Sequence, residues 1–237
     1  MRDGFVKVGA ATPDILVADC VHNREEIAKK VKEMAEAGTK VMAFPELCIT
    51  GYTCSDLFWQ ELLLERAKEE LHKLEEELEE VEGLIIVGLP LEFNQKLYNV
   101  AAVISGGKVL GFVPKHHLPN YAEFYEARHF TPGREDVEWV TFDGQEVPFG
   151  MNQLFHCADM PGLTVAAEIC EDLWVPNPPS VAAAMAGATV IVNLSASNEN
   201  TGKSLYRTAL VQNQSARLIC GYLYASAGEG ESTTDLV

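Results

Sequence analysis

A β-hairpin inside an otherwise alternating pattern of helices and strands is the sequence feature that most restricts the fold of this chain. Residues 99–115, NVAAVISGGKVLGFVPK, contain two apolar runs joined by Ser-Gly-Gly, a strong signal for a tight turn between neighbouring strands. The strands of such a hairpin run antiparallel. A purely parallel, Rossmann-type sheet is therefore excluded, and a layered α/β or mixed α+β domain is predicted.

The segments around the hairpin alternate between the two-residue period of strands and the longer period of helices. Asn23 and Glu26 resemble a capping box at the start of the first helix, and ten Glu between residues 61 and 82 are interpreted as the solvated face of another. No repeat or linker appears, so residues 1–237 are predicted to form one domain. Helices are expected over 23–38, 57–82, 179–188 and 203–218, and strands over 5–13, 40–44, 83–90, 163–169, 189–197 and 219–227, with a turn-rich stretch before about residue 160.

The charge of the chain argues against two classes of partner. The sequence carries 18 Lys and Arg against 35 Asp and Glu, a formal net charge of −17 that repels nucleic acid and anionic lipid surfaces. No run of about 18 apolar residues appears, so no membrane span is expected. We therefore predict neither a nucleic-acid partner nor a membrane partner.

The cysteines and the N-terminal residues predict a cytoplasmic protein. Six Cys are spread through the sequence without a CxxC pair, and MRDGFVKVGA lacks the long apolar run of a signal peptide. Reduced thiols in the cytoplasm are therefore expected. Adjacent histidines in extended chain, such as His116 and His117, point in different directions, so no metal site is expected.

Three ionisable residues stand where predicted strands end, which is where catalytic groups collect in layered α/β proteins. Glu46 follows VMAFP, Lys115 follows KVLGFVP and Cys170 follows LTVAAEI. Each alone is explained as well by a helix cap, a surface charge or a packed core thiol. Together they offer a base, a cation that stabilises developing negative charge, and a nucleophile.

The acidic neighbours of Cys170 raise a question about its reactivity. Glu168 precedes the cysteine, and Glu171 and Asp172 follow it directly. Nearby carboxylates disfavour the thiolate, which is the nucleophilic form of cysteine. Cys170 is thus either an inert buried thiol or a nucleophile activated by groups from elsewhere in the chain.

Three segments resemble the signature motifs of the nitrilase, or carbon–nitrogen hydrolase, superfamily. They are FPELCITGY, GFVPKHHLPNYAEFYEARHFTPG and AAEICEDLWVP. The segment from residue 193 to the end, NLSASNENTGKS and onward, is similar to the amino-terminal glutaminase domains of glutamine-dependent NAD(+) synthetases. The resemblance covers nearly the whole chain and implies a nitrilase-like α-β-β-α sandwich.

The resemblance also implies catalytic roles for four residues. Glu46 would be the general base toward the Cys170 thiol, which attacks the side-chain amide of glutamine. Lys115 and the backbone N–H of Glu171 would stabilise the oxyanion. Glu126 matches the additional glutamate that many members of the superfamily place near the triad, where it orients the lysine or the water.

Further residues are implied to contact the substrate. Tyr121 would form part of the pocket, Glu171 would pair with the α-ammonium of glutamine, and Ser197 would bind the α-carboxylate. Lys203 would be the other carboxylate partner, at a position where relatives often have Arg. Because Lys lacks the bidentate geometry of Arg, weaker binding of the carboxylate is expected. Tyr52 is interpreted either as lining the wall near the triad or as purely structural.

The resemblance further implies the partners of the chain. L-glutamine is the implied substrate, the glutaminase step needs no cofactor, and ATP and deamido-NAD belong to a synthetase domain that this sequence lacks. A homo-oligomer is expected. Relatives continue past the point where GEGESTTDLV ends, so a chain truncated at its C-terminal end is expected.

The sequence also contains features that suggest other functions. SNENTGKS follows a strand and precedes a helix, but Ser197 stands where a P-loop requires its first Gly, and no GxSxG motif of a serine hydrolase is present. A nitrilase-class amidase acting on another small amide remains open. So does a catalytically silent fragment that mainly supports assembly.

Overall fold

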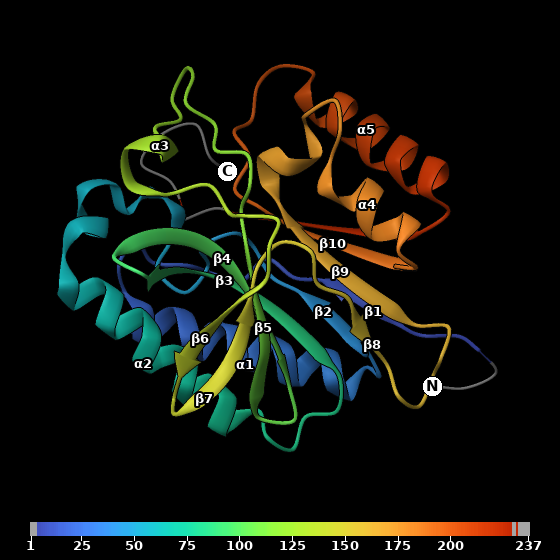
Figure 1. The fold of residues 1–237 in the computed structure, drawn as a ribbon, viewed down its shortest axis with the longest axis horizontal. Helices are drawn as coiled ribbons and strands as arrows, with labels where there is room; N and C mark the ends of the chain where they lie inside the picture. Colours follow the sequence, from blue (N-terminus) through green and yellow to red (C-terminus); the bar gives the residue numbers. More distant parts are fainter. Residues whose placement is uncertain (1–3, 229–230, 232–237) are drawn as a thin grey trace.

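A computed structural model describes residues 4–228 and Glu231 of the chain. Residues 1–3, 229–230 and 232–237 lie outside the described part, and they include most of the terminal segment GEGESTTDLV. Two β-sheets pack face to face at the centre, with a helical layer outside each (Figure 1). The predicted nitrilase-like α-β-β-α sandwich is therefore confirmed.

The larger sheet is mixed, as the hairpin requires. It has seven strands in the spatial order β1-β2-β3-β4-β5-β7-β6. β1, β2 and β3 run parallel, whereas β4 pairs antiparallel with both β3 and β5. The strands are β1 (Val8–Ala10), β2 (Val41–Ala43), β3 (Leu84–Phe93), β4 (Lys96–Ser105), β5 (Lys108–Pro114), β6 (Glu138–Phe142) and β7 (Gln145–Phe149).

The smaller sheet has four strands in the order β11-β10-β9-β8. Its three long strands are parallel, and Leu194 of β10 lies opposite Ile169 of β9. This register places the residues after Ile169 beside the end of β10. The strands are β8 (Phe155–His156), β9 (Thr164–Ile169), β10 (Val190–Ser195) and β11 (Gly221–Ser226).

The helices cover the outer faces of the two sheets (Figure 1). Helices α1 and α2 lie against the larger sheet, and α4 and α5 lie against the smaller one. No helix within residues 4–228 is long and apolar enough to cross a membrane. The helical elements are α1 (Cys20–Glu36), the 3₁₀ segment η1 (Tyr52–Trp59), α2 (Glu61–Glu77), α3 (Glu126–His129), the 3₁₀ turn η2 (Cys170–Leu173), α4 (Pro179–Met185) and α5 (Lys203–Leu218).

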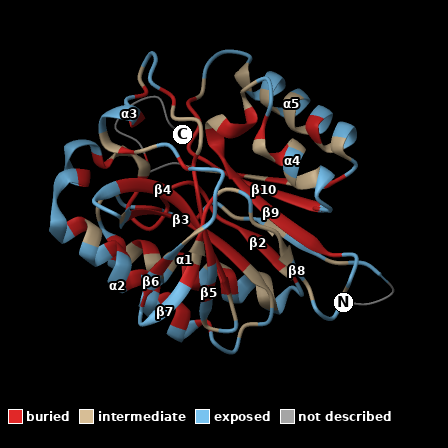
Figure 2. Ribbon diagram, in the orientation of Figure 1, coloured by how far each residue is buried: buried red, intermediate tan, exposed pale blue. Residues whose placement is uncertain are grey.

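Strand alternation separates the buried core into layers. Along β2, Val41 and Ala43 pack between the sheets, whereas Met42 and the following Phe44 pack under α1 and α2. Successive side chains of a strand point to opposite faces, so each central strand contributes to two cores. Both faces of the central strands are consequently buried, and exposure is concentrated on the outer helices and loops (Figure 2).

Three details differ from the sequence-based expectation. Helix α1 begins earlier than predicted, because Asp19 caps it by accepting from the His22 N–H, while Asn23 is buried and bonds the backbone of Leu16 and Ile49. The helix predicted over 57–82 is split, since Gln60 separates η1 from α2 in an extended conformation. The turn-rich stretch contains α3, β6, β7 and β8.

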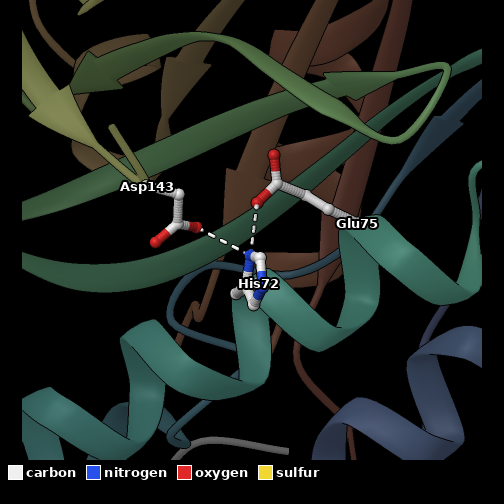
Figure 3. A group of neighbouring side chains, drawn as sticks. All are labelled: His72, Glu75 and Asp143. Carbon is white, nitrogen blue, oxygen red and sulfur yellow. Dashed lines mark ion pairs between the residues drawn. The ribbon is translucent and has the colours of Figure 1, made fainter. Parts of the chain in front are cut away.

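Ion pairs hold α2 against its neighbours. Of the ten Glu predicted to be solvated, Glu70 and Glu75 are buried. Glu70 accepts from Arg24 of α1 at 3.1 Å. In Figure 3, His72 of α2 points toward Glu75 and toward Asp143 in the β6–β7 turn, and the His72 Nδ1 to Asp143 Oδ2 distance is 2.8 Å. This pair connects the β6–β7 hairpin to the helix that covers the sheet.

The packing of α2 gives a direct test of the layered core. Leu71 is fully buried against the larger sheet, whereas Leu62 of the same helix is 69% exposed. We expect Leu71→Ala to lower the free energy of unfolding by about 2–5 kcal/mol, because it removes buried methyl groups and leaves a cavity. Leu62→Ala should change it by less than about 0.5 kcal/mol. Urea denaturation followed by circular dichroism measures both, and equal losses would contradict the assignment.

Candidate active site

The three ionisable residues at predicted strand ends lie at the ends of β2, β5 and β9 in the structure. Glu46 follows β2, Lys115 follows β5, and Cys170 begins η2 directly after β9. All three are at most 5% exposed. Glu46 and Lys115 are 69 residues apart in the sequence, yet Lys115 Nζ lies 2.6 Å from Glu46 Oε1.

Lys115 forms the centre of a buried charged cluster. Its Nζ donates to Glu46 Oε1 and to Glu126 Oε1, both at 2.6 Å. Asn99 Nδ2 donates to the same Glu46 oxygen at 2.6 Å, and the Tyr52 hydroxyl donates to Glu126 Oε1 at 2.7 Å. An ammonium has three N–H donors. Two of them bond partners among the described residues, so the third is available for a bound group.

The charges of this cluster are strongly coupled. Burial by itself lowers the pKa of Lys115, but the carboxylates of Glu126 and Glu46 more than compensate and hold it well above its ordinary value. Burial raises the pKa of Glu126, and the nearby Glu46 adds to that effect against the opposing ammonium. The Lys115 ammonium therefore keeps its proton at neutral pH, and Glu126 takes up a proton more readily than an ordinary glutamate.

The Cys170 thiol is buried beside this cluster. Burial and, after it, the Glu46 carboxylate raise its pKa to about 12, against the opposing effect of the Lys115 ammonium. Its φ of 44° lies in the left-handed region that non-glycine residues seldom adopt, at the turn from strand to helix. At neutral pH the resting thiol is protonated, so a reaction at sulfur requires a base.

The end of β10 brings the thiol and that base together. Ser195 Oγ donates to Cys170 Sγ at 3.2 Å, and the next backbone amide, Ala196 N–H, donates to Glu46 Oε2 at 3.0 Å. No hydrogen bond among the described residues joins Cys170 directly to Glu46 or Lys115. Two consecutive residues at the end of β10 therefore bond the Cys170 sulfur and the Glu46 carboxylate.

Asp172 fixes the turn that carries the cysteine. Its carboxylate accepts the backbone N–H of Ile169 at 3.1 Å and that of His117 at 2.8 Å, and a third, from His116, at 3.2 Å. The His117 ring bonds the same carboxylate at 3.0 Å. Because His116 and His117 directly follow Lys115, this one buried carboxylate connects the Cys170 turn to the lysine segment.

Two of the five residues expected to contact a substrate lie at an open cavity of about 520 Å³. Tyr121 and Lys203 line it together with Trp174. The Lys203 ammonium lies 5.0 Å from the centre of the Trp174 ring and bonds Asn198. Its pKa is lowered by burial.

The other three expected residues, Glu171, Ser197 and Tyr52, are not among the residues that line this cavity. The Tyr121 hydroxyl donates to Glu171 Oε2 at 3.0 Å, which places Glu171 beside the wall. Ser197 is buried, two residues beyond Ser195. Tyr52 and Glu126 line a separate, smaller cavity of about 160 Å³.

Sequence reasoning missed three residues of this site. Asn99, Ser195 and Asp172 each bond a residue or segment of the triad. Asn99 and Ser195 are polar residues at the ends of apolar strand runs, which was the available signal. Asp172 stands two residues after Cys170 and was weighed only as an unfavourable charge.

Comparison with known proteins agrees with this geometry. The model of the carbon–nitrogen hydrolase family matches residues 7–229. The chain belongs to this family. The expected membership in the nitrilase superfamily is therefore confirmed.

Named relatives of the chain are glutamine-dependent NAD(+) synthetases. The synthetase of Mycobacterium tuberculosis is 42% identical over 99% of this chain, and the match covers 35% of its length. The synthetase of Aquifex aeolicus is 32% identical over 91% of this chain, and the match covers 34% of its length. The chain thus spans about a third of the length of these relatives. A crystal structure of the synthetase from Cytophaga hutchinsonii superposes with a TM-score of 0.84 at 30% identity, over 94% of this chain and 36% of that one.

An amidase from Nesterenkonia sp. shares the fold. Its crystal structure superposes on the whole of this chain with a TM-score of 0.74 at 19% identity, covering 81% of the amidase. The same sandwich fold is therefore found in an amidase and within a longer synthetase chain.

The contact between Asp172 and His117 can be tested by titration. The hydrogen bond and the charge of Asp172 raise the pKa of the His117 ring. In Asp172→Asn the negative charge is lost, so we expect the pKa of His117 to fall toward about 6.5. NMR titration of the ring resonances measures this shift, with His156, which bonds Thr164, as the internal control. An unchanged His117 titration would contradict the contact.

Proposed function

We propose that the chain hydrolyses the side-chain amide of L-glutamine through a thioester on Cys170 and releases ammonia. The observation that carries the proposal is the buried Lys115 ammonium, held by Glu46 and Glu126 next to the Cys170 turn. A base, a cation and a thiol at one strand edge are the groups that nucleophilic acyl transfer requires. Membership of the carbon–nitrogen hydrolase family supports this class of reaction.

In the proposed acylation, Glu46 takes the proton of the Cys170 thiol as the sulfur attacks the amide carbon. A C–S bond forms and the carbonyl oxygen becomes an oxyanion. The third N–H of Lys115 and the backbone N–H of Glu171 donate to that oxyanion. The first N–H groups of a helical turn have no partner within the turn, so the Glu171 amide is suited to the role. The C–N bond then breaks, and Glu46 returns the proton to the departing ammonia.

In the proposed deacylation, water replaces ammonia. Glu46 takes a proton from the water, the hydroxide adds to the thioester carbon, and the C–S bond breaks as glutamate forms. The proton returns to the sulfur, and Glu46 is again a carboxylate. Glu126 holds Lys115 in place throughout, and its Oε2 atom, which has no partner among the described residues, is suited to binding the water.

The proposed glutamine site uses the charged groups around the open cavity. Glu171 pairs with the α-ammonium, while Ser197 and Lys203 bind the α-carboxylate. Tyr121 forms the wall and orients Glu171 through its hydroxyl. Tyr52 does not line this cavity and acts instead by bonding Glu126.

The wider role is proposed from the relatives. NAD(+) synthetases that depend on glutamine are the proteins to which this chain is similar, so we propose that its ammonia serves the ATP-dependent amidation of deamido-NAD. That step belongs to a synthetase domain, which would be a partner of the domain formed by residues 1–237. The proposed hydrolysis itself requires no cofactor. Assembly as a homo-oligomer in the cytoplasm completes the proposal.

Turnover of L-glutamine tests the proposal directly. We expect glutamate and ammonia in equal amounts, no turnover by Cys170→Ala, and a loss of about 10²–10⁴-fold in Glu46→Gln because the general base is removed. Cys157→Ala is the matched control, since Cys157 lies just after β8, outside the site. A coupled enzymatic assay measures both products, with and without a separately produced synthetase domain.

The remaining outcomes separate the alternatives. Turnover that appears only with the synthetase domain supports a glutaminase that depends on its partner. Faster hydrolysis of another small amide than of glutamine would contradict the substrate and favour a general amidase. No turnover under any condition would contradict the activity and favour a silent scaffold.

The role of Lys203 makes a separate prediction about binding. Lys203→Met should raise KM for glutamine by about 10-fold or more with little change in kcat, because a charge-assisted hydrogen bond to the carboxylate is lost. Lys203→Arg should lower KM, since its planar group binds a carboxylate with two hydrogen bonds. The matched control is 4-aminobutanamide, which lacks the α-carboxylate. An equal effect of Lys203→Met on both substrates would refute the assignment.

A further inference from the structure

The sulfur of Cys170 has a hydrogen-bond donor that the triad does not include. Ser195 Oγ donates to Cys170 Sγ at 3.2 Å, which is within the range of a hydrogen bond to sulfur. Ser195 is fully buried at the end of β10. The pairing of Leu194 with Ile169 carries Ser195 to the level of Cys170, so the contact is built into the register of the sheet.

A second hydroxyl holds the serine in this orientation. The Tyr224 hydroxyl of β11 lies 2.6 Å from Ser195 Oγ. Because the Ser195 hydrogen is directed at the sulfur, the tyrosine must donate the hydrogen of the shorter bond. Tyr224 is protonated at any pH at which the enzyme works, since burial raises its pKa. The chain of donors therefore runs from Tyr224 to Ser195 to Cys170.

We propose that Ser195 is a further catalytic residue, which donates a hydrogen bond to the Cys170 sulfur as that atom becomes negatively charged, and that Tyr224 is its positioning residue. The proposal rests on the thioester chemistry proposed above. Negative charge develops on the sulfur twice, once when Glu46 removes the thiol proton and again when the C–S bond of the thioester breaks. Ser195 transfers no proton in either step and retains its O–H bond.

The surroundings of the sulfur explain why this donor is needed. The site is buried, and the Glu46 carboxylate beside it disfavours the thiolate. Lys115 is a cation, but two of its three N–H donors bond carboxylates and the third is assigned to the oxyanion. Ser195 supplies a donor aimed at the sulfur alone. A hydrogen bond to a charged group in such a site corresponds to about 10- to 100-fold in the population or rate that it supports.

Alkylation of Cys170 by iodoacetamide tests the proposal without using glutamine turnover. The rate is measured between pH 6 and 10 by mass spectrometry of the peptide that contains Cys170. In Ser195→Ala we expect a rate about 10-fold lower or more at pH 8 and a pH profile displaced to higher pH, because the thiolate has lost its donor. Ser195→Thr, which keeps a hydroxyl, should restore most of the rate, and Tyr224→Phe should give a smaller loss in the same direction.

The matched control is Ser180→Ala. Ser180 is also buried and its hydroxyl accepts from Gln214 under α4, but no hydrogen bond among the described residues joins it to Cys170, Ser195 or Tyr224. An alkylation rate and pH profile in Ser195→Ala within twofold of the wild type would overturn the proposal. If Ser195→Ala fails to fold, Tyr224→Phe decides, since an unchanged profile there would overturn the relay. If the wild type does not hydrolyse glutamine but Ser195→Ala still displaces the pH profile of alkylation, the role of Ser195 is supported and the proposed function is rejected. The failure of one proposal can therefore be distinguished from the failure of the other.

Discussion

A lysine ammonium buried between two glutamates determines the arrangement of the rest of the site. An isolated charge in the interior is several kcal/mol unfavourable, and only close, hydrogen-bonded counter-charges offset that cost. Lys115 meets Glu46 and Glu126 at 2.6 Å each, and these residues come from the ends of β2 and β5 and from α3. The hydrogen bonds of this one ammonium therefore connect segments that are far apart in the sequence.

The sandwich supplies the remaining contacts from the other sheet. The Cys170 turn follows β9, and the end of β10 donates both to Cys170 and to Glu46. Asp172 of that turn in turn accepts the amides that follow Lys115. Hydrogen bonds therefore connect the two sheets in both directions. The end of β10 donates to Glu46 of the charged cluster, and the residues after Lys115 donate to Asp172 of the Cys170 turn. Reaction geometry here is a property of the sheet-to-sheet packing rather than of any single loop.

The local sequence pattern was sufficient to predict the helices and strands whose apolar residues recur regularly. It was not sufficient for elements that are stabilised by contacts with residues far away in the sequence. The β4–β5 hairpin and the strands β9, β10 and β11, which alternate with helices, were predicted from apolar periodicity and turn residues. β6 and β7 were missed because they are short, partly exposed and interrupted by Pro148, and they gain stability from pairing and from the Asp143 contact with His72. Glu46, Lys115 and Cys170 were predicted from strand ends and family motifs. The contacts of Asn99 and Ser195 could not be predicted, because they depend on which strands pair and in which register.

The acidic residues around Cys170 show how a charge that looks unfavourable in sequence is neutralised in the fold. Asp172 is surrounded by backbone N–H donors, and Glu171 accepts from Tyr121. Glu168 lies under α4, where it accepts the Ser180 amide at 2.8 Å, and burial raises its pKa to about 7. None of these three carboxylates opposes the thiolate as an unpaired neighbouring charge would. The carboxylates that do raise the pKa of the thiol are Glu46 and, to a smaller extent, Glu126. The proposed role of Glu46 as the base that accepts the thiol proton requires a carboxylate in that position.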